Sequence, residues 1–130
     1  MNVWADTNVL VRFITRDDPE QTRRVATIMR RAERGELSIR VSPIVIAEVI
    51  WVLHSYYKYE LTAIAAALRE FLVAEGIWVE DVDVVIEALR LVREGAAFTD
   101  AYVASLARSH REPVFTFDAG FKRLGVEIFA

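Results

Sequence analysis

The chain has 130 residues, 54% of them hydrophobic, with no cysteine and a formal net charge of −3. This length fits one domain with its own core but not two ordinary domains, so we expect a single domain over residues 1–130. The charge excludes the global basic field of many nucleic-acid-binding modules, and the lack of cysteine excludes a disulfide framework.

No segment has the pattern of a membrane span or a secretion signal. The longest apolar run, Pro43 to Leu53, reaches about half of the roughly 20 residues that a spanning helix needs. The N-terminus, Met-Asn-Val-Trp-Ala-Asp, lacks the basic start and small-residue cleavage site of a signal peptide. We therefore expect a cytoplasmic protein that does not enter a membrane.

Short apolar runs alternate with helical patterns from the N-terminus onward. Residues 3–5 predict a first strand. Asp18-Pro19 supplies an N-cap and a proline at the first helical position, so a helix begins there and ends at Gly35. Residues 37–41 predict a second strand, after which Ser42-Pro43 begins a helix that continues to about residue 56.

The second half of the chain continues this alternation. The predicted elements are a helix over about residues 61–75 that ends at Gly76, a strand at 77–79, helices at about 84–94 and 100–110, and strands at 113–117 and 126–129. Strands separated by helices predict a parallel sheet that is covered on both faces. In such a sheet, ligands bind beyond the carboxyl ends of the strands.

Four acidic residues stand among apolar neighbours, whereas most other acids lie among charges. Asp6 closes the first predicted strand and Asp118 the fourth, which puts both at the ligand-binding edge. Glu48 is the only charge in an apolar helix, so we expect it to be buried and to need a charge partner or a metal. Asp100 begins a helix, where the N-terminal dipole favours a carboxylate.

Each of these acids also has a purely structural interpretation. Asp6 and Asp118 could form turns, Asp100 could stabilise the first turn of its helix, and Glu48 could be half of a buried ion pair. Together the four favour one shared pocket, in which their mutual repulsion calls for a divalent cation. Oxygen ligands without His or Cys favour Mg²⁺ or Mn²⁺ over Zn²⁺. Such an ion can activate water and neutralise the leaving oxygen of a phosphodiester.

At these residues the chain resembles the PIN-domain nucleases, and within them the toxin subunits of VapBC-type toxin–antitoxin pairs. The resemblance runs through nearly the whole chain and rests on four motifs in order: Asp6-Thr7-Asn8-Val9-Leu10, Glu48 with Val49-Ile50-Trp51-Val52-Leu53, Phe98-Thr99-Asp100-Ala101, and Thr116-Phe117-Asp118 with Phe121. It implies a three-layer α/β/α fold with a five-stranded parallel sheet in the order 3-2-1-4-5.

The resemblance also implies RNA cleavage that depends on Mg²⁺ or Mn²⁺, by a homodimer that a small antitoxin neutralises. Asp6, Asp100 and Asp118 would ligate the metal directly or through water, and Glu48 would orient a metal-bound water. Thr7, Asn8 and Thr116 are either supporting contacts of these ligands or ordinary turn and cap residues. Many relatives carry a further acid just after the position of Asp118, where this chain has Ala119-Gly120. That departure puts a tight second metal site in doubt.

Other function classes fit these residues less well. A receiver-like, Mg²⁺-binding signalling domain needs an adjacent acidic pair after its first strand, and an aspartate-based phosphatase needs Asp-x-Asp, where this chain has Asp6-Thr7-Asn8. A PIN fold kept as a non-catalytic binding partner stays open, although the presence of all four acids argues against it. The aromatic run from Trp51 to Tyr59 predicts either a dimer or antitoxin surface, or core packing.

Overall fold

The structure is a computed structural model that describes residues 1–130. The chain divides into two compact units, Met1–Glu80 and Asp81–Ala130. Both units are built from helices and short parallel strands, which confirms the predicted α/β class. None of the helices combines the length and the apolar composition needed to cross a bilayer.

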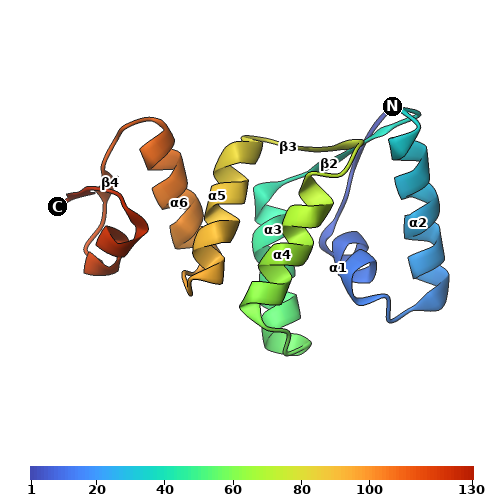
Figure 1. The fold of residues 1–130 in the computed structure, drawn as a ribbon, viewed down its shortest axis with the longest axis horizontal. Helices are drawn as coiled ribbons and strands as arrows, with labels where there is room; N and C mark the ends of the chain where they lie inside the picture. Colours follow the sequence, from blue (N-terminus) through green and yellow to red (C-terminus); the bar gives the residue numbers. More distant parts are fainter. The chain divides into compact units, whose positions relative to one another are not determined.

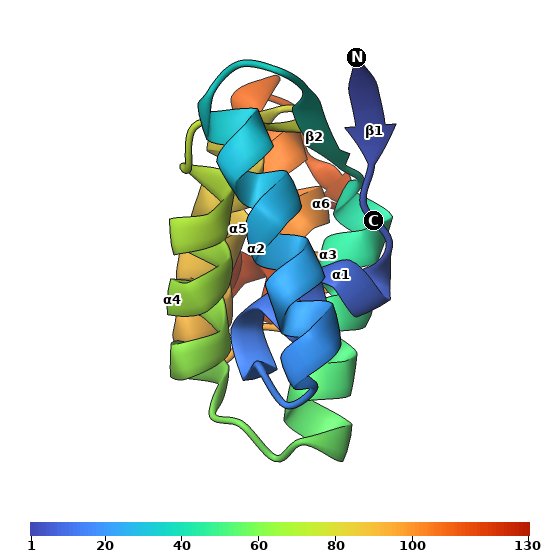
Figure 2. The ribbon, with the colours of Figure 1, turned by 90° about the vertical axis from the view of Figure 1, so that its right-hand side faces the viewer.

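The first unit contains a three-stranded sheet and its helices (Figure 1). Its elements are β1 (Asn2–Trp4), α1 (Thr7–Thr15), α2 (Pro19–Glu33), β2 (Ser38–Val41), α3 (Pro43–Trp51), the π-helix η1 (Val52–Tyr56), α4 (Leu61–Leu72) and β3 (Ile77–Val79). The strands are parallel in the order β1-β2-β3. Figures 1 and 2 show α1 and α2 side by side, in agreement with their packing contacts.

Side-chain caps begin α1, α2 and α3 of this unit. Asp18 Oδ1 accepts a hydrogen bond from Gln21 N at 3.0 Å, and Ser42 Oγ accepts one from Ile44 N at 3.2 Å, as their sequence patterns predict. Helix α1 is absent from the elements predicted above. It begins by the same device, since Asp6 Oδ1 accepts from Val9 N at 3.1 Å. A capping residue directly after a strand was therefore the signal for this helix.

The two faces of the three-stranded sheet differ in burial. Ile39 and Val41 are buried on one face, where Val25 and Met29 of α2 line a cavity together with Ile39. Trp4 and its neighbours across the strands lie on the opposite face, which is more exposed. Period-two alternation of side chains along each strand produces this difference.

The second unit contains two packed helices and a small sheet. Its elements are α5 (Val82–Arg93), α6 (Phe98–Ser109), β4 (Val114–Phe115), the 3-10 helix η2 (Ala119–Leu124) and β5 (Ile128–Phe129). Helix α5 packs along α6. An apolar cluster joins α6 to the strands and η2 through Ala104, Val114, Phe121 and Val126.

The hydrogen-bonded strands are described as two sheets, one in each unit, where the resemblance implies one sheet of five strands. Hydrogen bonds join β1-β2-β3 into one sheet and β4-β5 into another, so the strand order agrees with 3-2-1-4-5 only within each sheet. Strand β4 has two residues and pairs with β5 through Val114 N to Glu127 O at 2.8 Å and Thr116 N to Phe129 O at 3.3 Å. Local patterns identify strands, but pairing between distant strands depends on tertiary packing. That residues 1–130 form a single domain stays a prediction.

A hydrogen-bonded network in the first unit connects α1, the following loop and the chain after η1. Tyr57 donates to Asp17 Oδ2 at 2.7 Å and accepts from Arg12 Nη1 at 3.2 Å. Arg12 also pairs with Asp17 at 3.2 Å, and Thr15 donates to the same carboxylate at 2.8 Å. The Tyr57 hydrogen bond, followed by the one from Thr15, holds the pKa of Asp17 below its usual range.

We expect Tyr57→Phe to reduce stability at neutral pH by an amount that shrinks in acid. A lowered folded-state pKa means that ionised Asp17 stabilises the fold above the unfolded value of about 3.9, and that this contribution is lost as the pH falls through the folded value. Thermal melts from about pH 3 to pH 7 measure this difference in Tm. Tyr56→Phe is the matched control, because that side chain is exposed and makes only a ring contact. An equal Tm deficit at both ends of the pH range would contradict the expected link to Asp17.

Candidate metal centre

Asp100 and Asp118 line the same cavity of the second unit, whose volume is about 400 Å³. Asp100 lies in the first turn of α6, and Asp118 stands between β4 and η2. Gly95, Ala96 and Gly120 also line this cavity, so little side-chain bulk stands beside the two carboxyl groups. Two of the four predicted acids are therefore brought together by the fold of this unit.

Local hydrogen bonds fix the orientation of Asp118. Its Oδ1 accepts from Gly120 N at 2.8 Å, while its backbone N–H donates to Thr116 Oγ1 at 3.0 Å. A Cβ at position 120 would lie 3.0 Å from Asp118 Oδ1, so glycine leaves room for the carboxylate. Oδ2 keeps no protein hydrogen-bond donor and is available to a ligand. This bond between the Thr116 hydroxyl and a backbone N–H two residues later is that of a turn residue, and a role of Thr116 in supporting a metal ligand stays a prediction.

The Asp100 carboxylate has no hydrogen bond or ion pair with another protein group. It is half-buried in the first turn of α6, where unpaired backbone N–H groups make the surroundings favourable for negative charge. The helix end stabilises this carboxylate without neutralising it. A cation could therefore bind Asp100 without first displacing a basic side chain.

Asp6 and Glu48 belong to the first unit, and both are exposed. Asp6 Oδ1 caps α1, which confirms its structural role, and its Oδ2 has no protein donor. The expected burial of Glu48 is wrong. Helix α3 buries Ile46, Val49 and Ile50, so Glu48 falls on the opposite face between the exposed side chains of Ile44 and Trp51.

The buried ion pair considered for Glu48 is also wrong, because neither Glu48 nor the other three acids takes part in an ion pair. The error about burial has a simple cause. Apolar residues on every face of α3 hide its helical phase, so the sequence pattern does not tell which face is covered. All four carboxylates remain chemically available to a cation.

The donor set fits a hard divalent cation. No group of three or more His, Cys, Asp or Glu side chains is gathered at metal-binding distance within either unit. Mg²⁺ commonly takes only one or two carboxylates and completes its shell with water and substrate phosphate, which matches the Asp100 and Asp118 pair. Zn²⁺ is disfavoured, because no His or Cys lines this cavity.

Two charged residues outside the predicted motifs also line the cavity of Asp100 and Asp118. Arg123 of η2 lies there without an ion pair, and its guanidinium can receive a phosphate. Glu94 follows α5 and forms an ion pair with Arg90 at 3.0 Å. Neither has apolar neighbours on both sides in the sequence, which is the signal that identified the four acids.

Comparison of the sequence with known proteins identifies the family of this chain. A family model described as the PIN domain matches residues 3–127. No curated protein sequence matches the chain. PIN domains are typically metal-dependent nucleases and generally bind divalent metals, which agrees with the carboxylate chemistry above and sets aside the receiver-like alternative. Because the match covers all but a few terminal residues, the chain belongs to the PIN-domain family.

Proposed function

We propose that this protein is a metal-dependent endoribonuclease that hydrolyses RNA phosphodiester bonds. The observation that carries the proposal is the pair of carboxylates, Asp100 and Asp118, in one cavity of a PIN-family chain. Asp6 and Glu48 complete the proposed set of acids. Neither carboxylate takes part in an ion pair, so both are free to face a cation or a substrate.

Each acid has a distinct proposed role. Asp6, Asp100 and Asp118 would hold one Mg²⁺ or Mn²⁺, directly or through water. The bound ion would supply Lewis-acid activation of water and charge neutralisation at the scissile phosphate. Glu48 would accept a hydrogen bond from the attacking water and so orient it toward phosphorus. Arg123 would hold a phosphate oxygen of the RNA beside Asp118.

We also propose that the protein is the toxin of a toxin–antitoxin pair, and that it acts as a homodimer bound by a small antitoxin. The aromatic run from Trp51 to Tyr59 supports this proposal, because Trp51 and Tyr56 are 65% and 79% exposed. Large exposed apolar groups mark surfaces that bind other proteins. Sedimentation at micromolar concentration should show a dimer, and a strict monomer with no antitoxin-like protein encoded beside it would contradict the proposal.

Cleavage of total RNA with Mn²⁺ and with EDTA tests the proposed activity. We expect discrete new ends with Mn²⁺ and intact RNA with EDTA, and mapping those ends would identify the sites of cleavage. Uncut RNA in both conditions would favour the non-catalytic alternative. Equal cleavage in both would show that the reaction does not need the metal.

We expect Mn²⁺ to stabilise the folded wild-type protein. A ligand that binds only the folded state adds about 2.7 kcal/mol at 100 times its dissociation constant, which raises Tm by an amount on the order of 10 °C. Asp118→Asn keeps an oxygen that can accept from Gly120 N, yet it removes a charged ligand, so it should gain much less from Mn²⁺. Scanning calorimetry with EDTA and with about 5 mM Mn²⁺, a concentration suited to weak oxygen sites, measures both shifts. Equal gains in the two proteins would count against Asp118 as a ligand.

A further inference from the structure

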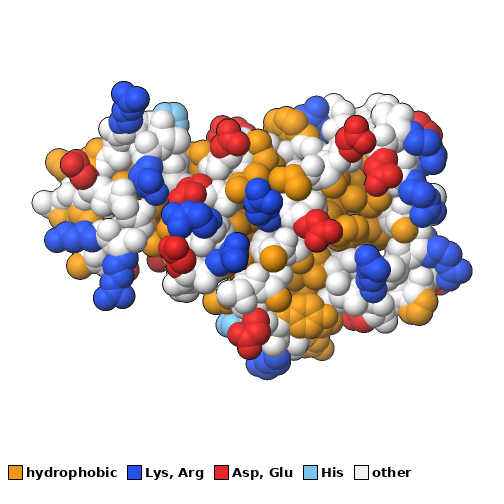
Figure 3. Space-filling model, in the orientation of Figure 1, with side chains coloured by type: hydrophobic (Ala, Val, Ile, Leu, Met, Phe, Trp, Pro, Cys, Tyr) orange, Lys and Arg blue, Asp and Glu red, His pale blue; other side chains and the backbone are white.

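Helix α2 concentrates positive charge on its outward side. Residues 21–32 of this helix include four arginines and no acid, although the whole chain has a net charge of −3. Met29 and Ala32 are buried on the inward side. The helical period of 3.6 residues turns Arg23 and Arg30, which are seven residues apart, to the opposite side. Figure 3 shows basic side chains along the right-hand edge of the view, where Figure 1 places α2.

Three of the four arginines have no charge partner. Arg23, Arg24 and Arg30 are exposed and take part in no ion pair, and we call them the arginine face of α2. Thr27 lies between them, donating to Arg23 O at 3.0 Å and accepting from Arg30 Nη2 at 3.2 Å. This contact holds the Arg30 guanidinium along the helix surface. The fourth arginine is half-buried and already forms an ion pair.

The arginine face indicates a ligand with several negative charges. Like charges on one helix repel each other, and no acid between them offsets that repulsion. Solubility is served better by a surface that mixes both signs of charge. A polyanion removes the repulsion, and a cationic surface raises the local concentration of such a ligand.

The chemistry of the arginine face favours phosphate groups over a protein partner. Helix α2 has no aromatic residue, and its only large apolar side chain at the surface is Ile28, which is 36% exposed. Protein interfaces normally have an apolar core, which this face does not provide. Guanidinium groups bind phosphate oxygens in bidentate geometry, and contacts to a phosphate backbone need no surface for base stacking.

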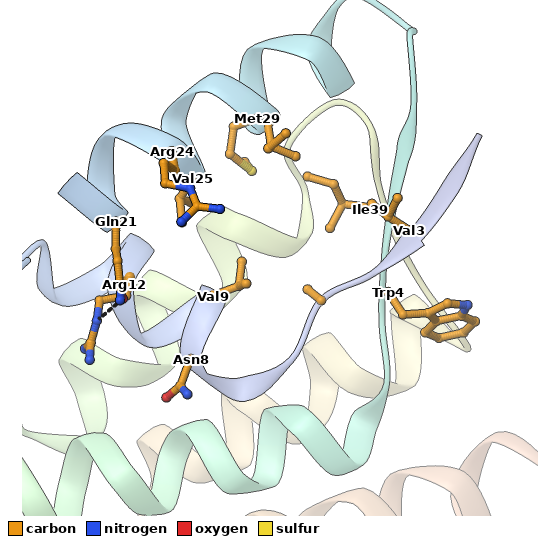
Figure 4. A pocket seen from close by; sticks show the side chains of 12 residues that line it. Val3, Trp4, Asn8, Val9, Arg12, Gln21, Arg24, Val25, Met29 and Ile39 are labelled. Atoms are coloured by element: carbon orange, nitrogen blue, oxygen red, sulfur yellow. Dashed lines mark hydrogen bonds between the residues drawn. The ribbon is translucent and has the colours of Figure 1, made fainter.

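We propose that the arginine face of α2 binds the phosphate backbone of RNA, an inference that rests on the proposed ribonuclease function. Contacts of this kind position RNA without reading its sequence. Arg24 also lines the pocket of Figure 4, together with Asn8 of α1, and Asn8 follows Asp6 by two residues. RNA on this face is therefore held by the same unit that carries a proposed metal ligand.

Binding of labelled RNA in EDTA, measured by fluorescence anisotropy at several salt concentrations, tests the proposal. The probes are a single strand of about 12 nucleotides and a duplex of about 12 base pairs, because only the single strand offers unpaired bases. The triple variant Arg23→Gln, Arg24→Gln and Arg30→Gln should bind at least about 10-fold more weakly at about 50 mM salt. The slope of log affinity against log salt should become shallower by about 2–3. A loss with either probe supports the proposal, and the larger loss identifies the form of RNA that this face holds.

Matched variants separate a local contact from folding and from net charge. Arginine and glutamine have similar helix propensities, so the triple variant should stay folded, as thermal melts would show. Arg69→Gln is the control for Arg23→Gln, because Arg69 is an exposed arginine of α4 that also forms no ion pair. Arg23→Lys keeps the charge and should retain most of the salt slope.

Two results would overturn the proposal. One is unchanged affinity and salt slope of the triple variant with both probes, which would leave an acidic protein as the ligand of the arginine face. The other is a loss in Arg69→Gln as large as the loss in Arg23→Gln, which would assign the effect to net charge.

The outcome also distinguishes this inference from the proposed function. RNA binding that the triple variant loses, in a protein that never cuts RNA, would retain the arginine face and reject the nuclease. Metal-dependent cleavage by the triple variant at the wild-type rate, with the protein below saturation, would do the reverse.

Discussion

Asp6→Asn and Asp100→Asn should each lower the rate of RNA cleavage at least about 100-fold while the protein stays folded, because a catalytic metal contributes several kcal/mol. Asparagine keeps the side-chain oxygen and removes the charge that holds a cation. The Asp6→Asn variant separates the proposed metal-binding role of this residue from its role as a helix cap. Asparagine is as good an N-cap as aspartate, so the hydrogen bond from Val9 N can persist in Asp6→Asn.

Single-turnover cleavage of a labelled RNA in Mn²⁺ measures this loss, and circular dichroism melts confirm folding. Asp83→Asn is the control, because it is an exposed first-turn acid of α5 outside the cavity of Asp100 and Asp118. Cleavage by Asp6→Asn at the wild-type rate would show that Asp6 serves only as a helix cap. Equal losses in all three variants would point to a general effect of net charge.

Gly76→Ala should destabilise the first unit by about 2–5 kcal/mol. A non-glycine residue with positive φ costs about 1–2 kcal/mol, and overpacking adds about 1–3 kcal/mol. Gly76 has φ +83°, and a Cβ there would lie 2.6 Å from both Cβ and O of Ala32. Because backbone of α2 is the obstacle, a rotamer change cannot relieve the contact.

Gly35→Ala is the matched control for the crowding at Gly76. Gly35 has φ +77°, but a Cβ added there would meet nothing within 4 Å, so only the backbone term of about 1–2 kcal/mol should appear. Urea titration of both variants gives the difference in free energy of unfolding. Similar losses in the two variants would show that the approach to Ala32 relaxes easily.

Local features of the fold were predictable where short-range chemistry determines them. Asp18-Pro19 and Ser42-Pro43 mark two helix starts that the structure confirms, and Gly35 and Gly76 both adopt positive φ where helices were predicted to end. The division into two sheets was not predictable. Strand pairing depends on contacts between distant segments, and the pattern of one short strand does not encode its neighbour.

The candidate site was predictable only in part, because a sequence pattern reports neighbours along the chain and not neighbours in space. Isolation among apolar residues identified Asp100 and Asp118, which share a cavity. It also led to the wrong burial for Glu48, because an apolar neighbour in sequence need not be a neighbour in space. Arg123 also lines this cavity, but a basic side chain on a short helix has no sequence pattern that separates a phosphate contact from an ordinary exposed charge.

We propose that Asp6, Glu48, Asp100 and Asp118 serve one divalent cation, and paramagnetic broadening by Mn²⁺ tests this proposal most directly. Thr7, Val49, Ala101 and Ala119 each follow one of the four acids, so their backbone amide signals report on those positions. With substoichiometric Mn²⁺, all four signals should broaden together and saturably, while the signal of Gly35 stays sharp and Mg²⁺ causes no broadening. Broadening confined to Ala101 and Ala119, or general broadening without saturation, would contradict a shared four-carboxylate site.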